Sequence, residues 1–159
     1  MPLLLGGDVA FEPTETSSGF VIGTRPELIF AWTKSDEKTT TYGFGFGPYI
    51  EAMGSTGTSQ IWLGGGATAV FYRRWFGVAL SGGLDCDWLH ANPNASPVIS
   101  LFAGLRPTSL AGVDFPVGLR VDFRPPVGDV PATMIFALQL DFAGLAVGFF
   151  AALTHGLNN

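Results

Sequence analysis

The sequence predicts an all-β fold, a transmembrane antiparallel up-and-down β-barrel of eight to ten strands. Three observations predict it. Apolar residues make up 47% of the 159 residues, whereas charged residues make up only 13%. No stretch approaches the roughly 20 consecutive apolar residues that a membrane-spanning helix needs. Almost every segment instead alternates strictly, with aromatic and β-branched residues at one parity and Gly or charged residues at the other.

Nine segments show this alternation and are the predicted strands. They are approximately residues 3–11, 19–33, 40–53, 58–72, 75–88, 96–106, 114–124, 132–142 and 145–154. In the second of them, Phe20, Ile22 and Trp32 share one face, and Gly23 and Arg25 share the other. We expect residues 1–159 to form a single barrel domain.

Three hairpins are predicted, because their parity matches on both faces. Their turns are centred on residues 35–39, on Arg73-Arg74 and on Ala143-Gly144. The predicted cross-strand pairs are Trp32–Tyr42, Phe30–Phe44, Leu28–Phe46, Phe71–Phe76, Leu63–Leu84, Leu140–Val147 and Leu138–Phe149. The first register also sets Pro26 opposite Pro48. Because Pro cannot donate to the ladder, a local bulge is expected there, and the alternative is a gap that accommodates a partner or lipid.

The strand count leaves two alternatives open, because single-chain bacterial barrels have an even number of strands. Either the segment 3–11 lies outside the barrel, which leaves eight strands, or a tenth strand comes from an omitted segment or a neighbouring chain. The second alternative predicts a protein partner at an unpaired strand edge.

The composition of the two faces predicts which of them meets lipid. The apolar face carries hardly a charge, as expected where Arg or Lys costs about 2 to 4 kcal/mol at the bilayer midplane. The other face combines Gly with Arg, Asp and Glu, which form hydrogen-bonded pairs in a confined space. The sequence therefore predicts a polar network in the lumen, formed by Arg25, Glu27, Glu51, Asp85, Asp87, Arg106, Arg120, Asp122, Arg124, Gln139 and Asp141. Asp8 and Glu12 have the same parity.

Aromatic residues near strand ends predict two membrane interfaces. The predicted interface aromatics are Trp32, Tyr42, Phe76 and Phe142 at one rim and Trp88 at the other.

Several function classes are not expected. The net charge is −5 and no basic stripe exists, so nucleic acid is not an expected partner. With Cys86 as the single cysteine and no Cys/His cluster at zinc spacing, neither a disulfide nor a metal or other cofactor is predicted. The sequence shows no Ser, His and carboxylate set of the kind a lipid-modifying barrel enzyme needs, because His90 and His155 fall outside the strands. Asp85 and Asp87 are better explained as ion-paired residues than as an acid and base, so no enzyme is predicted.

Over its whole length the chain resembles a small bacterial outer-membrane β-barrel protein, without a motif of one subfamily. The resemblance implies a location in the bacterial outer membrane, surrounded by the lipid bilayer or detergent. It also implies a structural or narrow-pore function, with a lumen largely filled by charged pairs. The start MPLLLGG lacks the features of a secretion signal, so this location requires that the numbering describe a mature chain. Two alternatives are a barrel subunit of a larger membrane assembly and a soluble barrel that binds an apolar ligand.

Overall fold

The computed structural model of the chain describes residues 2–11, 16–35, 41–73, 76–88, 95–105, 117–128 and 131–141. Its strands are β1 (Pro2–Phe11), β2 (Thr16–Thr24), β3 (Phe30–Ser35), β4 (Thr41–Ser55), β5 (Gln60–Arg73), β6 (Phe76–Asp87), β7 (Ala95–Leu105), β8 (Val117–Arg124) and β9 (Ala132–Asp141). In this part of the chain, no helix is long and apolar enough to cross a membrane.

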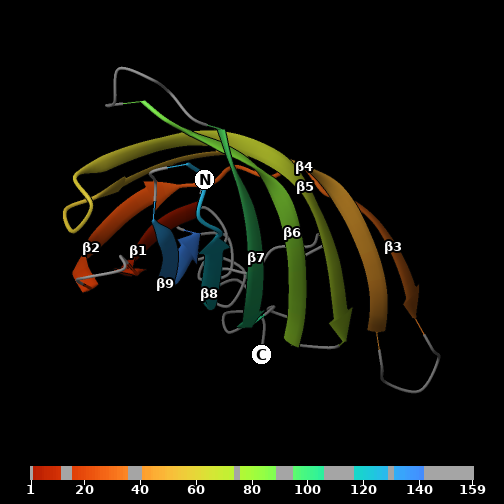
Figure 1. Cartoon of the computed structure of the whole chain (residues 1–159). Helices are drawn as coiled ribbons and strands as arrows, with labels where there is room; N and C mark the ends of the chain where they lie inside the picture. The colour runs from red at the N-terminus through yellow and green to blue at the C-terminus, as the bar shows by residue number, and fades with distance from the viewer. Residues whose placement is uncertain are drawn as a thin grey trace, which may run out of the picture.

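The sheet closes on itself as an antiparallel barrel. β1 pairs with β2 on one side and with β9 on the other, and from β9 back to β3 each strand pairs with its neighbour in sequence. β2 and β3 both pair with β4 and lie end to end along it, so together they occupy one of eight strand positions. Figure 1 shows β4 to β7 as a curved wall, with β1, β8 and β9 opposite.

The predicted antiparallel barrel is therefore confirmed, with eight strand positions. The first eight predicted segments correspond to these positions, and the ninth, 145–154, lies outside the described residues. The alternative in which the segment 3–11 lies outside the barrel is wrong, because β1 pairs along its length with both β2 and β9.

The predicted hairpin across Ala143-Gly144 is wrong in its pairing. Both edges of β9 are occupied, by β8 and by β1. Leu140, for example, lies between Val117 and Leu3, which leaves no edge at which it could face Val147. The second strand of that predicted hairpin lies outside the described residues.

The predicted register of β3 with β4 is wrong by two residues. Trp32 lies opposite Phe44 and not opposite Tyr42, and the other pairs of this hairpin shift with it. The last pair before the turn is Ser35 with Thr41, so the turn is centred one residue later than predicted. When the centre of a turn moves by one residue, each residue of the hairpin faces a partner two positions further along. Because side chains alternate with a period of two, inward-facing residues still face inward.

The register of β5 with β6 differs from the prediction in the same way. Phe71 lies opposite Val78 and not opposite Phe76, because Phe76 pairs with Arg73. Arg73 thus belongs to the strand and not to the turn. Alternation predicts the face of each residue, but several registers satisfy the same alternation.

Pro26 and Pro48 do not lie opposite one another, and no bulge separates β2 from β3. The register with β4 is the same in β2 and in β3, so no residue is inserted between them. The Leu28 N–H donates to the Pro48 carbonyl at 3.0 Å, and the Ile50 N–H donates to the Pro26 carbonyl at 3.1 Å. Each Pro therefore loses its own donor but still accepts a ladder hydrogen bond.

The two faces of the barrel have opposite polarity. Asp85 and Asp122 point inward and are 0% exposed, whereas Ile50 and Leu119 point outward and are each 67% exposed. Small buried apolar clusters complete the interior. The inside of this barrel therefore combines buried charged residues with small apolar clusters, and its outside is apolar.

Glycines on the inner face provide the space that large inward side chains occupy. The ring of Phe102 lies where a Cβ of Gly104 or Gly118 would be. The hydroxyl of Tyr72 lies in the same way over Gly43. This accounts for the regular spacing of Gly on the inward parity.

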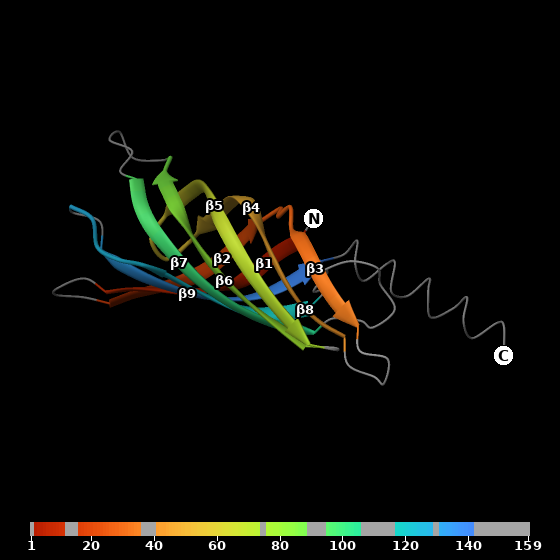
Figure 2. The same cartoon turned by 90° about the vertical axis from the view of Figure 1, so that its right-hand side faces the viewer.

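The strands run obliquely between two rims, as Figure 2 shows from the side. At rim A, β4 joins β5 through residues 56–59, and the ends of β6 and β8 lie at Asp87 and Arg124. At rim B, β3 ends at Ser35 and β5 ends at Arg73.

Candidate functional site

The interior holds a cluster of charged side chains to which β8 contributes three members. Arg120, Asp122 and Arg124 occupy alternate positions of this strand, so all three point into the barrel. Each is at most 3% exposed. The sequence of β8 thus places two guanidinium groups and one carboxylate in a row along the inner wall.

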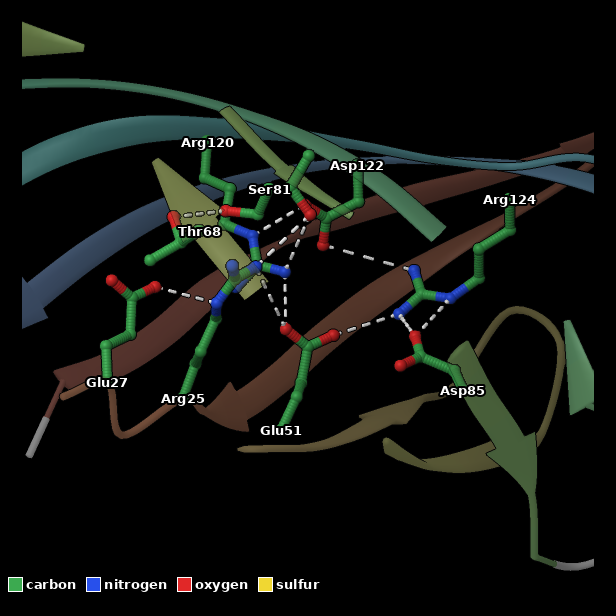
Figure 3. Close-up of polar contacts among 10 residues, drawn as sticks. Arg25, Glu27, Glu51, Thr68, Ser81, Asp85, Arg120, Asp122 and Arg124 are labelled. Atoms are coloured by element: carbon green, nitrogen blue, oxygen red, sulfur yellow. Dashed lines mark hydrogen bonds and ion pairs between the residues drawn. The ribbon is translucent and has the colours of Figure 1, made fainter. Parts of the chain in front are cut away.

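Glu51 of β4 is the centre of this cluster, as Figure 3 shows. One carboxylate oxygen accepts a hydrogen bond from Arg120, and the other accepts one from Arg124 at 3.0 Å. The guanidinium of Arg25 lies 3.5 Å from the first oxygen. Because β4 and β8 are not neighbours in the sheet, these contacts cross the lumen.

Arg124 also binds Asp85 of β6. Its Nε donates to Asp85 Oδ2 at 3.0 Å and its Nη2 donates to the same oxygen at 2.5 Å. The guanidinium carbon lies 4.6 Å from the ring centre of Trp62, a cation–π contact on the β5 wall. A second carboxylate, Asp122, lies 4.0 Å from Arg124 Nη1.

Arg25 enters the cluster from the segment between β2 and β3. Its Nε lies 2.8 Å from Glu27, and its guanidinium carbon lies 3.5 Å from the ring centre of Tyr49. Its Nη1 donates at 3.2 Å to Ser100 Oγ, which also accepts a hydrogen bond from Arg120. A hydroxyl of β7 therefore links two arginines that repel one another.

The charges of the cluster nearly cancel. Three arginines face three fully buried carboxylates, Glu51, Asp85 and Asp122, while the side chain of Glu27 is 22% exposed at the edge. Arg120 Nε lies 2.5 Å from Asp122, so each guanidinium has at least one carboxylate partner. Burying single charges is costly unless they are paired and hydrogen-bonded, and pairing across the lumen meets that requirement.

The structure brings together most of the predicted polar network. Seven of its members are buried inward, namely Arg25, Glu51, Asp85, Asp87, Arg120, Asp122 and Arg124. Glu27 lies at the edge, and Gln139 is half-buried on β9. Arg106 and the side chain of Asp141 lie outside the described residues.

The register predicted for the first hairpin sets Arg25 beside Tyr49, and the two side chains do meet, although that register is wrong by two residues. The contact of Arg124 with Trp62 is not predicted by alternation, because inward parity does not tell which residues meet across the lumen. Asp8, which has inward parity in β1, lies apart from the cluster and accepts a hydrogen bond from Ser55 Oγ at 2.8 Å.

The predicted interface aromatics lie on the outer surface. Trp32, Tyr42 and Phe76 are exposed near rim B, and Trp88 is exposed near rim A. Phe142 lies outside the described residues.

The chemistry of the cluster is that of mutual neutralisation. Each of its arginines has at least one carboxylate neighbour. In the described ranges no group of three or more His, Cys, Asp or Glu residues could hold a metal ion. His90 and His155 lie outside these ranges, so the predicted absence of a catalytic set stays a prediction.

Comparison with known proteins finds no matching family model, no matching curated protein and no matching solved structure.

Proposed function

We propose that this chain is a bacterial outer-membrane β-barrel protein of the structural or narrow-pore type. One observation carries the proposal: the barrel is apolar outside and charged inside. Outward residues such as Phe30, Leu80 and Leu101 are more than half exposed, whereas the arginines of the inner cluster are almost fully buried.

A lipid bilayer around the barrel explains its apolar outer face better than surrounding water does. Soluble monomers rarely expose contiguous apolar patches larger than a few hundred Å². Here exposed large apolar side chains occur on all eight strand positions, with aromatic residues towards both rims. Pairing of β1 with both β2 and β9 also closes the sheet there, which satisfies the backbone hydrogen bonds of these strands without water, as the bilayer interior demands.

Filling of the lumen limits what such a barrel can conduct. Contacts of Glu51 with Arg120 and Arg124 cross the interior from β4 to β8. An eight-strand barrel has an interior that side chains just fill. We therefore expect little steady current when the purified protein is inserted into a planar bilayer. A large, persistent conductance would contradict the filled lumen while leaving the membrane location intact.

Detergent dependence combined with gel mobility tests the membrane proposal directly. We expect the folded protein to need detergent to stay monodisperse and to migrate differently on a denaturing gel before and after boiling. A stable monomer in detergent-free buffer would instead support the soluble alternative. The ion pairs that cross the lumen count against that alternative, because an apolar ligand requires an apolar cavity.

One observation favours the second candidate, a barrel subunit of a larger membrane assembly. Within the described residues β3 pairs with β4 alone, so its other edge has no strand beside it there. An open edge can accept a strand of another chain. Cross-linking in membranes would then give a defined larger species, whereas a monodisperse monomer at all concentrations would count against it.

A further inference from the structure

The outer face carries a row of cationic and aromatic side chains at rim B. In the sheet Lys34 lies beside Tyr42, Tyr42 beside Arg73, and Arg73 beside Phe76, so the four point outward together. Among the described strand residues, Lys34 and Arg73 are the charged ones with outward parity, and both are exposed. The outward-pointing positive charges of the described strands therefore lie together at rim B.

A groove lies directly beside this row. It has a volume of about 320 Å³, and the outward-pointing residues that line it are Tyr42, Phe71, Arg73, Phe76 and Val78. Its lining is almost wholly apolar, and Arg73 is the one charged residue among those that line it. The volume is at the lower end of the roughly 300 to 1,000 Å³ typical of small-molecule sites.

We propose that this groove binds one membrane phospholipid, with an acyl chain against Phe71 and Val78 and the phosphate between Arg73 and Lys34. The inference rests on the proposed membrane location. Adjacent strands are about 4.8 Å apart, so the two cations, separated by Tyr42, are roughly 10 Å apart at the backbone. Flexible side chains of this length can converge on one anion, and a guanidinium binds phosphate through two parallel hydrogen bonds.

Charge complementarity selects the occupant. Within the described strands β3 to β6 no Asp or Glu has outward parity, so no carboxylate of these strands repels a phosphate. Free phosphate would leave the apolar groove empty, and an uncharged lipid would leave two cations without an anion at an interface. A phospholipid provides both an acyl chain for the apolar groove and a phosphate for the two cations.

Native mass spectrometry of the protein in detergent micelles, titrated with phosphatidylglycerol, tests the site. We expect one retained lipid, binding at least tenfold more tightly than diacylglycerol, which lacks the phosphate. Arg73→Gln should weaken phosphatidylglycerol binding about tenfold, and Arg73→Lys should weaken it less. Phe11→Gln, a change at an exposed aromatic of rim A, is the matched control and should leave binding unchanged.

Three outcomes would overturn the inference. They are equal binding of the two lipids by the unchanged protein, equal binding by Arg73→Gln and the unchanged protein, and displacement of the lipid by millimolar inorganic phosphate. The comparison of phosphatidylglycerol with diacylglycerol uses the unchanged protein. It therefore still tests the inference if Arg73→Gln does not fold. Failure of the membrane proposal is separate, because it would appear as a barrel that is monodisperse without detergent.

Discussion

At the scale of single residues, Glu51 is the carboxylate on which the inner cluster depends. It contacts Arg25, Arg120 and Arg124, whereas Glu27 contacts Arg25 alone and is 22% exposed. We expect Glu51→Gln to lower the free energy of unfolding by roughly 3 to 5 kcal/mol, because it leaves buried guanidinium groups without their shared counter-charge. Urea titration in detergent, followed by the gel mobility of folded and unfolded protein, measures this.

Glu27→Gln is the matched control for that variant. The substitution has the same chemistry but occurs at a partly exposed edge, where loss of an ion pair costs about 1 kcal/mol or less. Equal unfolding midpoints for the two variants would mean that the cross-lumen contacts of Glu51 contribute nothing to stability.

Gly64 tests whether the inward glycines are required for space. A Cβ there would collide with Asp85 Oδ1 and with the Leu84 carbonyl. Gly82 points outward, and its nearest contact would be the Val98 carbonyl at 4.0 Å. We expect Gly64→Ala to cost about 1 to 3 kcal/mol through overpacking and Gly82→Ala to be tolerated. The same urea titration compares them, and an equal effect of the two changes would contradict the packing argument.

At the scale of elements, the sequence predicts faces better than registers. Every predicted strand that the structure describes keeps its inward and outward residues, because alternation is a local property. Register depends instead on where each turn begins, and neither Ser35 nor Arg73 carries a signal that separates strand from turn. Both described hairpins consequently shift by two residues.

The native Cys86 allows the β5–β6 register to be measured. In the structure Cys86 lies opposite Leu63, whereas the register expected from the sequence would set it opposite Ile61. Directly paired residues have Cα atoms about 5.5 Å apart or less, within disulfide range, and diagonal neighbours are about 7 to 8 Å apart. We expect oxidation to link Leu63→Cys to Cys86 and to leave Ile61→Cys mostly unlinked, as shown by intact mass. If Ile61→Cys is linked to Cys86 and Leu63→Cys is not, the register expected from the sequence is correct and that of the structure is wrong.

At the scale of the whole molecule, closure and the site geometry could not be predicted from the sequence. Closure pairs β1 with β9, from opposite ends of the described chain, and no local pattern specifies that contact. The polarity of the interior was predictable, because parity sorts Arg120 and Glu51 onto one face. Their contact across the lumen was not, because it depends on the stagger of the strands around the barrel.

The outer face gives the sharpest test of what surrounds the molecule. Leu80 lies in the middle of β6, points outward and is 55% exposed, while Phe76 lies at the rim B end of the same strand. In a bilayer an Arg at mid-depth costs about 2 to 4 kcal/mol, and near an interface it costs about 0 to 1 kcal/mol. We therefore expect Leu80→Arg to destabilise the barrel in lipid vesicles much more than Phe76→Arg does.

If the outer face meets water, Leu80→Arg is not expected to destabilise the barrel more than Phe76→Arg does. An exposed Leu replaced by Arg on a soluble barrel loses little packing, and surface substitutions usually stay within about 0.5 kcal/mol. Unfolding titrations of both variants in vesicles therefore distinguish the two surroundings by depth dependence alone. If Leu80→Arg and Phe76→Arg unfold at the same denaturant concentration as the unchanged chain, the outer face does not meet lipid. A steep difference between two positions four residues apart on one strand requires a surrounding medium whose polarity changes over that distance, as it does from the interface to the middle of a bilayer.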